Sequence, residues 1–337
     1  MRFSNHVVVR RLGLITLAQA LGARVRSGWR LIAIAAVGIA ALFAQPSLGD
    51  AKSDDAYLFT SFQGNGEAGL QFLCSEDMYA WKRVPAYFLK PQVGDSRLMR
   101  DPCLLRGPND TFHLVWTTGW KNDNGFGYAH SKDLRNWSEQ RFIPVMEHEP
   151  TTVNVWAPEL FYDERNEQFI ITWASTIPGR FPDGSEPHDN NQRTYYTTTR
   201  DFESFAPTRL FFDPGFNVID CTIVQYGRGY ALVLKDNSRT KMNLRVAFGA
   251  SPVGPWQEVS PPFTQAFTEG PTVLKAGDDY LIYFDAYRQG VYGAVKTRDF
   301  KSFVDVTHEA SFPEGHKHGT ALRVPRSLFD GLTRPNR

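Results

Sequence analysis

The sequence predicts an all-β fold, a five-bladed β-propeller. The prediction rests on two series of repeats and on the phase between them. The first series reads Ser or Thr, any residue, Asp, an apolar residue, two residues and an aromatic residue. It begins at Ser75, Ser131, Thr199 and Thr297, and a degenerate copy begins at Ala250. The spacing of about 47 to 68 residues matches one four-stranded blade per repeat.

The strands of each blade follow from apolar runs upstream of these motifs. Five such runs have the composition of strands: AYLFTSF from residue 56, TFHLVWTT from 111, QFIITWAST from 168, GYALVLKD from 229 and DYLIYFDA from 279. Shorter leading runs begin at residues 100, 157, 219, 269 and 318: RDPCLL, APELFY, IDCTIV, EGPTVL and HGTALRV.

The phase of the leading runs predicts that the ring is closed by the C-terminal strand. The first repeat lacks a leading run, and the last run, HGTALRV, has no repeat after it. Pairing of the C-terminal strand with the N-terminal blade would leave no exposed sheet edge. A pair of β-sandwich domains is the alternative, but it explains neither the fivefold count nor the phase.

The first fifty residues predict an export signal. Several arginines, the last of them Arg30, precede the apolar run LIAIAAVGIAALFA at 31–44, which is short for a transmembrane helix. We therefore expect a signal peptide at 1–49, a propeller at 55–325, a C-terminal tail at 326–337 and a secreted or periplasmic protein. An uncleaved anchor is the alternative for 1–49, and otherwise no stable membrane association is expected.

Charge and cysteine content narrow the range of partners. The chain has 37 Lys and Arg against 36 Asp and Glu, so no strong field favours nucleic acid, and none is expected as a partner. Three cysteines, Cys74, Cys103 and Cys221, exclude a dense disulfide framework. A Cys103–Cys221 bridge is conceivable, but buried free thiols are the preferred interpretation.

Acidic residues stand at the starts of the leading runs. In a propeller the inner strands of all blades line the central channel and start at the same face. This arrangement is expected to gather five side chains around one funnel: Asp101, Glu159, Asp220, Glu269 and His318. Crowded carboxyls acquire different pKa values, and glycoside hydrolysis needs one protonated and one ionised carboxyl. A single Asp-Pro or Glu-Gly-Pro is usually a turn, but the repetition in phase favours a site.

The loops that leave the second strands return to this face and should form the walls of the pocket. They carry Trp116, Trp120, Lys235, Asp285 and Arg288. Aromatic faces stack on sugars, and the cations can bind polar groups. We expect Trp116, Trp120, Lys235 and Arg288 to bind substrate.

The chain resembles the five-bladed propeller glycosidases of glycoside hydrolase family 43, the arabinosidase and xylosidase group, over roughly residues 55–325. The resemblance rests on RDP, VID and EGP, which occur in the order and spacing of that family. It implies that Asp101 is the general base, that Asp220 modulates pKa values, that Glu269 is the general acid, and that the anomeric centre is inverted. Cys221 departs from the family pattern, in which proline or alanine follows the aspartate.

Two further motifs extend the resemblance. VWAPEL is similar to the blade-two signature, which implies that Trp156 and Glu159 line the substrate pocket. HGTALRV is similar to the last inner strand, which implies that His318 lies near the axis and could help to hold a hydrated calcium ion. Calcium prefers oxygen ligands, so this support is weak, and no cofactor is otherwise required.

Together these features predict a secreted arabinofuranosidase- or xylosidase-like glycosidase that acts on plant or microbial carbohydrate. One alternative is a non-catalytic propeller that binds a glycan or a protein, because this architecture hosts many functions. Such a module does not need base, modulator and acid at three strand starts. The other alternative is a fructan-cleaving propeller glycosidase, in which Arg-Asp-Pro lies in blade three and not in blade one.

Overall fold

The structure of the chain, a computed structural model, describes residues 55–182, 186 and 191–334. The chain divides into two compact units, Met1–Ala51 and Lys52–Arg337, and all of the described residues belong to the second. The signal peptide expected at 1–49 lies outside the described residues. In the part of the chain that is described, no helix has the length and apolar character needed to cross a membrane.

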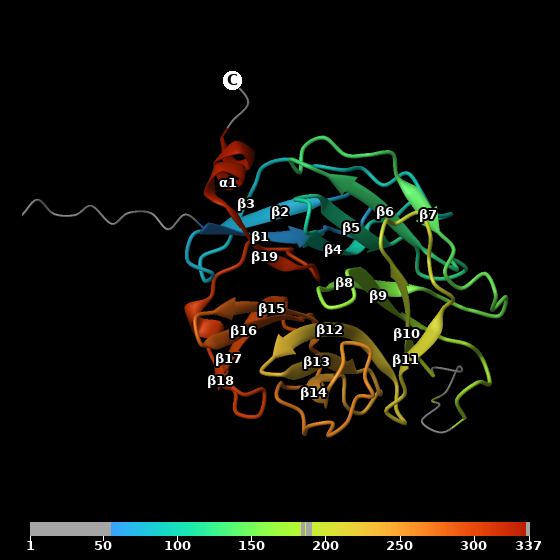
Figure 1. Cartoon of the computed structure of the whole chain (residues 1–337). Helices are drawn as coiled ribbons and strands as arrows, with labels where there is room; N and C mark the ends of the chain where they lie inside the picture. The colour runs from blue at the N-terminus through green and yellow to red at the C-terminus, as the bar shows by residue number, and fades with distance from the viewer. Residues whose placement is uncertain (1–54, 183–185, 187–190, 335–337) are drawn as a thin grey trace, which may run out of the picture. The chain divides into compact units, whose positions relative to one another are not determined.

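The second unit folds as a five-bladed β-propeller, which confirms the predicted fold class (Figure 1). Blade one contains β4 (Arg100–Arg106), β5 (Phe112–Thr117), β6 (Phe126–Ser131) and β7 (Arg141–Ile143). Blade two contains β8 (Trp156–Asp163), β9 (Gln168–Ser175), β10 (Arg193–Thr199) and β11 (Arg209–Phe212). Blade three contains β12 (Val218–Tyr226), β13 (Gly229–Asp236) and β14 (Asn243–Gly249). Blade four contains β15 (Glu269–Ala276), β16 (Asp279–Ala286), β17 (Val291–Thr297) and β18 (Val304–Asp305), and the short 3-10 helix η1 (Thr307–Glu309) follows it.

The end of the chain closes the ring, as the phase of the repeats predicts. Blade five has the strand order β19–β1–β2–β3. Its strands are β19 (Ala321–Pro325), β1 (Asp55–Ser61), β2 (Gln71–Ser75) and β3 (Lys82–Arg83). Strand β19 pairs antiparallel with β1, so the innermost strand of the N-terminal blade comes from the C-terminus.

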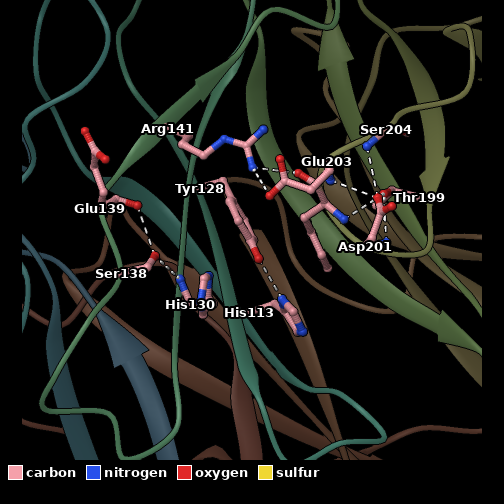
Figure 2. Close-up of polar contacts among 11 residues, drawn as sticks. His113, Tyr128, His130, Ser138, Glu139, Arg141, Thr199, Asp201, Glu203 and Ser204 are labelled. Carbon is pink, nitrogen blue, oxygen red and sulfur yellow. Dashed lines mark hydrogen bonds and ion pairs between the residues drawn. The ribbon is translucent and has the colours of Figure 1, made fainter.

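The hydrophobic core lies between the blades. Each of the five clusters of buried apolar side chains in the described residues joins two neighbouring blades. At the interface of blades one and two, the Phe202 ring stacks on His113 and on Tyr128, with centroid distances of 4.3 and 4.4 Å. The His113 Nδ1 lies 2.9 Å from the Tyr128 hydroxyl (Figure 2). Burial lowers the pKa of His113 to about 4, so this histidine packs as a neutral aromatic ring.

The repeated aspartates close turns, as the sequence predicts for this series. Asp201 accepts hydrogen bonds from the backbone N–H groups of Glu203 and Ser204, both at 2.9 Å (Figure 2). The equivalent aspartates, Asp77, Asp133 and Asp299, accept the corresponding pairs of bonds in their own turns. The degenerate copy at Ala250 has no aspartate, and in its blade a single bridge between Phe248 and Gln257 stands where the other blades have a fourth strand.

The C-terminal residues correct one expectation. The segment expected to be a tail forms helix α1 (Arg326–Thr333; Figure 1). Its Phe329 and Leu332 pack into the cluster between blades five and one. The domain therefore extends beyond residue 325. The three cysteines are buried free thiols, as expected from their number.

Candidate active site

Two adjoining chambers open at the axis of the propeller. They share four lining residues: Arg100, Asp101, Glu269 and His318. The first chamber has a volume of about 170 Å³ and the second about 360 Å³. The first chamber is completed by Trp120, Trp156, Ala157, Ile219, Asp220, Lys235 and Asn237. Asp101, Asp220, Glu269 and His318 therefore meet around one cavity, although they are far apart in the sequence.

A β-bulge at the start of four inner strands orients these side chains. The pairing register shifts at the same place in β4, β8, β12 and β15. A residue with positive φ lies in each bulge: Asp101, Ala157, Asp220 and Gly270, with φ between 45° and 57°. A bulge leaves an extra residue unpaired and turns its side chain away from the regular alternation. Asp101 and Asp220 are therefore aimed at the axis by the same device.

The bulges also reveal that the acids do not occupy equivalent positions. Glu269 stands one residue before the residue with positive φ in its strand, whereas Glu159 stands two residues after it. In the sequence, Glu159 and Glu269 belong to the same series of acidic residues at the starts of the leading runs. Their different places in the bulge give the carboxyls different surroundings.

Asp101 is held as an ionised carboxylate by two neighbours. Its Oδ1 lies 3.3 Å from His318 Nδ1, and its Oδ2 accepts a 2.9 Å hydrogen bond from the Thr117 hydroxyl. Burial opposes ionisation, but the hydrogen bond and positive charge of His318 outweigh it and hold the pKa of Asp101 below its usual value. Thr117 in turn accepts the backbone N–H of Ala157, which ties blade one to blade two at this point.

Asp220 lies deeper than Asp101. Only 5% of it is exposed, and its Oδ2 accepts the backbone N–H of Gly270 at 3.0 Å. Burial raises the pKa of Asp220, and the charge of Glu269 acts in the same direction, against the opposing effects of His318 and Lys235. Asp220 and Asp101 are thus shifted in opposite directions within one cavity.

Glu269 forms an ion pair with a buried lysine. Lys235 Nζ donates to Glu269 Oε2 at 2.6 Å, and the lysine side chain is 4% exposed against 34% for the glutamate. Burial would lower the pKa of Lys235, but the charges of Glu269 and Asp220 raise it above the usual value. The Lys235 ammonium also lies 5.3 Å from the Tyr287 ring centroid. Lys235 is therefore a fixed, buried cation in the wall of the first chamber.

His318 supplies a second cation at the axis. Burial alone would lower its pKa, but the hydrogen bond to Asp101 and the charges of Asp220, Asp101 and Glu159 raise it to about 10. This imidazolium does not fit the calcium site implied by the resemblance. Calcium takes six to eight oxygen ligands, whereas the His318 Nδ1 faces Asp101. The described residues contain no group of three or more His, Cys, Asp or Glu that could hold a metal ion.

Glu159 lies beneath the cavity and does not line it. It is 8% exposed, and its Oε2 accepts a hydrogen bond from the Cys103 thiol at 3.4 Å. Burial raises the pKa of Glu159 to about 8, although the positive charge of His318 opposes the shift. The expectation that Glu159 contacts substrate is corrected by this burial.

The predicted aromatic wall is present in part. Trp120 and Trp156 line the first chamber, with ring centroids 5.8 Å apart and planes nearly perpendicular. Trp120 is 49% exposed, and its Nε1 donates to Asn65 Oδ1 at 2.7 Å. The Arg100 guanidinium covers one face of Trp120 at 4.0 Å from the ring centroid. Aromatic and cationic groups of this kind bind sugar rings and their hydroxyls.

Two predicted binding residues lie elsewhere. Trp116 is fully buried in the cluster between blades five and one, because its position in β5 faces the neighbouring blade. Gly127 on β6 leaves room for its indole, since a Cβ there would lie 2.1 Å from the ring. Arg288 lines neither chamber, and its guanidinium stacks at 3.4 Å from the Phe267 centroid.

The family of the chain follows from comparison with known sequences. A protein-family model described as a probable glycosyl hydrolase domain, related to glycoside hydrolase family 43, matches residues 53–330. The chain belongs to this family. An α-L-arabinofuranosidase of Bifidobacterium longum subsp. longum is 22% identical to it over an alignment of 206 residues, and the match covers 52% of this chain and 19% of that protein. The chain thus spans about a fifth of the length of this curated relative.

A solved structure shares the fold of this chain. A thermostable family-43 glycoside hydrolase superposes with a TM-score of 0.52 at 14% sequence identity. The alignment covers 66% of this chain and 78% of that protein. At this identity the similarity establishes the five-bladed fold, and the chemistry has to be argued from the residues of this chain.

Some residues around the cavity of this family-43-related domain were not assigned a role from the sequence. Arg100 and Asn237 line the first chamber, and Asp285 lines the second. Arg100 is adjacent to Asp101 in the RDP motif, so its place at the cavity could have been expected. Asn237 follows β13 directly, and no repeated pattern marks it.

Proposed function

We propose that the propeller hydrolyses glycosidic bonds with inversion, on arabinofuranosyl or xylosyl substrates. The observation that carries the proposal is the junction between the two chambers, which Asp101 and Glu269 both line. A glycosidic bond between two sugar units would lie at such a junction, with one unit in each chamber. An inverting enzyme needs a base and an acid on opposite sides of that bond.

Asp101 is the proposed general base. The His318 imidazolium and the Thr117 hydroxyl favour its ionised form, and a base must be ionised to take a proton from water. The activated water attacks the anomeric carbon on the face opposite the leaving oxygen. Asp220 is the proposed modulator of pKa values, since its negative charge raises the pKa of both His318 and Lys235.

Glu269 is the proposed general acid. Lys235 occupies only its Oε2, and no described residue donates a hydrogen bond to Oε1. Oε1 is therefore the oxygen that carries the proton in the protonated form of Glu269 and delivers it to the glycosidic oxygen as the bond breaks, which leaves a carboxylate paired with the Lys235 ammonium. Trp120 and Trp156 are the proposed binding surface for the sugar unit in the first chamber.

We also propose that the protein is secreted or periplasmic, because its substrates are plant or microbial carbohydrates outside the cell. The arginine-flanked apolar run at 31–44 supports export. Edman sequencing of the protein from a native-like host checks this point. A mature N-terminus between residues 45 and 55 is expected, and a protein that begins near Met1 would argue for an anchor.

The proposed activity is tested with aryl glycosides that carry arabinofuranosyl, xylopyranosyl and galactopyranosyl groups. Release of the aryl group is expected for at least one of the first two. Proton NMR of the first product formed should show the anomer opposite to that of the substrate. A retained anomer would refute inversion, and no hydrolysis of any of the three would refute the glycosidase.

A further inference from the structure

The second chamber differs from the first in its shape and its lining. It is about twice as large, and its outer rim consists of exposed residues, Gly290, Val291, Glu314 and Gly315. Asp285, Tyr287 and Lys317 form its wall beside the shared residues. An oligosaccharide that starts in the small first chamber can therefore extend outward through the second.

Asp285 is a buried carboxyl that faces this chamber and has no partner among the described residues. It is 8% exposed, and none of the residues that the structure describes donates a hydrogen bond to it or forms an ion pair with it within contact distance. A buried carboxyl normally has hydrogen-bond partners, because desolvating an unsatisfied polar group is costly. Its free acceptor sites are therefore available to a ligand in the chamber.

The position of Asp285 relates it to the proposed acid. It lies directly opposite Glu269 in the pairing of β16 with β15. A general acid contacts the leaving oxygen, so the residue beside it on the chamber side is placed near the leaving group. The sugar that occupies the second chamber is then the one that departs.

The charges around Asp285 suit sugar hydroxyls. Burial and the charge of Glu269 raise the pKa of Asp285 to about 7, while His318, Lys317 and Lys235 oppose the shift. Near neutral pH the carboxyl can accept hydroxyl hydrogen bonds, and when protonated it can also donate one. Lys317 Nζ donates to the Gly64 carbonyl at 2.7 Å, which leaves further N–H groups for a ligand.

We propose that the second chamber is a binding site for the leaving-group sugar and that Asp285 accepts hydrogen bonds from its hydroxyls. The inference rests on the proposed glycosidase function and narrows its substrate class to di- and oligosaccharides, in which the leaving group is itself a sugar. Asp285 is a specificity-determining residue in this scheme and takes no part in proton transfer.

The test compares three substrates with the wild-type protein and Asp285→Asn. The substrates are a dinitrophenyl glycoside, a methyl glycoside and the disaccharide of the same glycosyl unit: arabinobiose or xylobiose. Loss of a charge-assisted hydrogen bond should raise KM for the disaccharide about tenfold with kcat unchanged. KM and kcat for the other two substrates should stay at the wild-type values, because neither carries a leaving-group sugar.

The methyl glycoside separates binding from acid catalysis, since it needs protonation but offers no sugar hydroxyls on its leaving group. A fall in kcat for the methyl glycoside would overturn the inference and assign Asp285 to proton transfer. An equal effect on all three substrates would overturn it as well, because Asp285 would then act on the sugar in the first chamber. A wild-type protein that hydrolyses none of the three would instead refute the proposed function.

Two additional variants guard against a folding defect. Asp278→Asn is the matched control, because this exposed aspartate lies in the turn at the far end of the same hairpin and should leave all values unchanged. If Asp285→Asn does not fold, Lys317→Met removes a second polar group from the same chamber. It should likewise raise KM for the disaccharide alone, and a KM equal to that of the wild type would overturn the proposal.

Discussion

Single residues around the axis show how one cavity can keep its carboxyls in different states. Asp101 has two hydrogen-bonding neighbours that favour its ionised form, whereas among the described residues no such neighbour contacts the Asp285 carboxyl. Burial is the largest influence on both, and the neighbours decide the direction of the shift. Two carboxyls that line the same cavity are thus held in different protonation states at the same pH by their immediate neighbours.

The assignment of Glu269 as the acid predicts a dependence on the leaving group. In Glu269→Gln, hydrolysis of disaccharides and methyl glycosides should fall by about 10²- to 10⁴-fold, the typical contribution of general acid catalysis. Dinitrophenyl glycosides need little protonation of the leaving oxygen and should lose much less. Steady-state rates on both classes provide the measurement, and equal losses would remove Glu269 from the role of acid.

The assignment of Asp101 as the base predicts a different pattern. Water must be activated whichever group departs, so Asp101→Asn should lose about 10²- to 10⁴-fold on both classes of substrate. The ratio of the two rates should stay near that of the wild type. A variant that spared the poor leaving groups would show that Asp101 is not the base.

His318 is expected to set the acid limb of the pH–rate profile. In His318→Gln the Asp101 carboxylate loses its cationic partner, so the pKa of Asp101 should rise. The base should then become ionised only at a higher pH. The acid limb of kcat/KM should therefore move to higher pH. The exposed His308→Gln serves as the control. If His318→Gln has reduced activity but the acid limb of its kcat/KM profile stays at the wild-type pH, His318 has only a packing role.

Residue-level predictions from the sequence succeeded where a motif marks the strand start. Asp101, Asp220 and Glu269 lie at one cavity because RDP, VID and EGP begin inner strands. Trp116 and Arg288 were misplaced because strand composition does not reveal which neighbour a side chain faces. The bulges that aim the carboxyls depend on pairing register, which no residue pattern in the sequence marks.

At the scale of elements, strand β19 holds the ring together. Val324 of this strand is only 1% exposed, whereas the neighbouring Arg323 is exposed. Val324 belongs to the cluster between blades five and one, to which helix α1 also contributes. The strand is therefore both the inner edge of blade five and a part of its hydrophobic contact with the next blade.

This double role predicts a large effect of a single substitution. Val324→Asp places an unpaired charge in the core and should abolish soluble folding or lower Tm strongly, because an uncompensated buried charge costs several kcal/mol. Arg323→Gln on the exposed side of the same strand should change Tm little. Soluble yield and thermal unfolding of the two variants provide the measurement. A cooperative transition of Val324→Asp at the wild-type Tm would contradict this role of β19.

At the scale of the whole propeller, the sequence predicts the architecture better than the site. The fivefold count and the closure follow from repeats that each form one blade, and the interfaces follow because every blade must bury both of its faces. Helix α1 was missed, since its eight residues contain only two buried apolar side chains and follow the last repeat directly. The sequence places Asp285 in the wall of the pocket but marks it with no motif, and its role emerges only from the chamber that residues of blades four, five and one line together.

The axis is also where the stability of the propeller should respond to pH. Glu159 is buried where blades one and two meet, and its pKa is raised from 4.5 to about 8 by burial. The folded state then keeps a proton that the unfolded chain releases above pH 4.5, so the free energy of unfolding falls as pH rises from 4.5 to 8. Ionisation of Glu159 should cost roughly 4 kcal/mol at pH 8, at about 1.4 kcal/mol per pKa unit.

Glu159→Gln keeps the shape and the acceptor for the Cys103 thiol but cannot ionise. Wild type should lose several degrees of Tm between pH 5 and pH 8, and the variant should lose clearly less. His318 adds its own decline in both proteins, because its pKa is raised to about 10 and its contribution fades as pH rises from about 6.5 through that value. The exposed Glu164→Gln, in the same hairpin, should follow the wild type. Parallel curves for wild type and Glu159→Gln would mean that Glu159 is ionised in the folded protein already at pH 5.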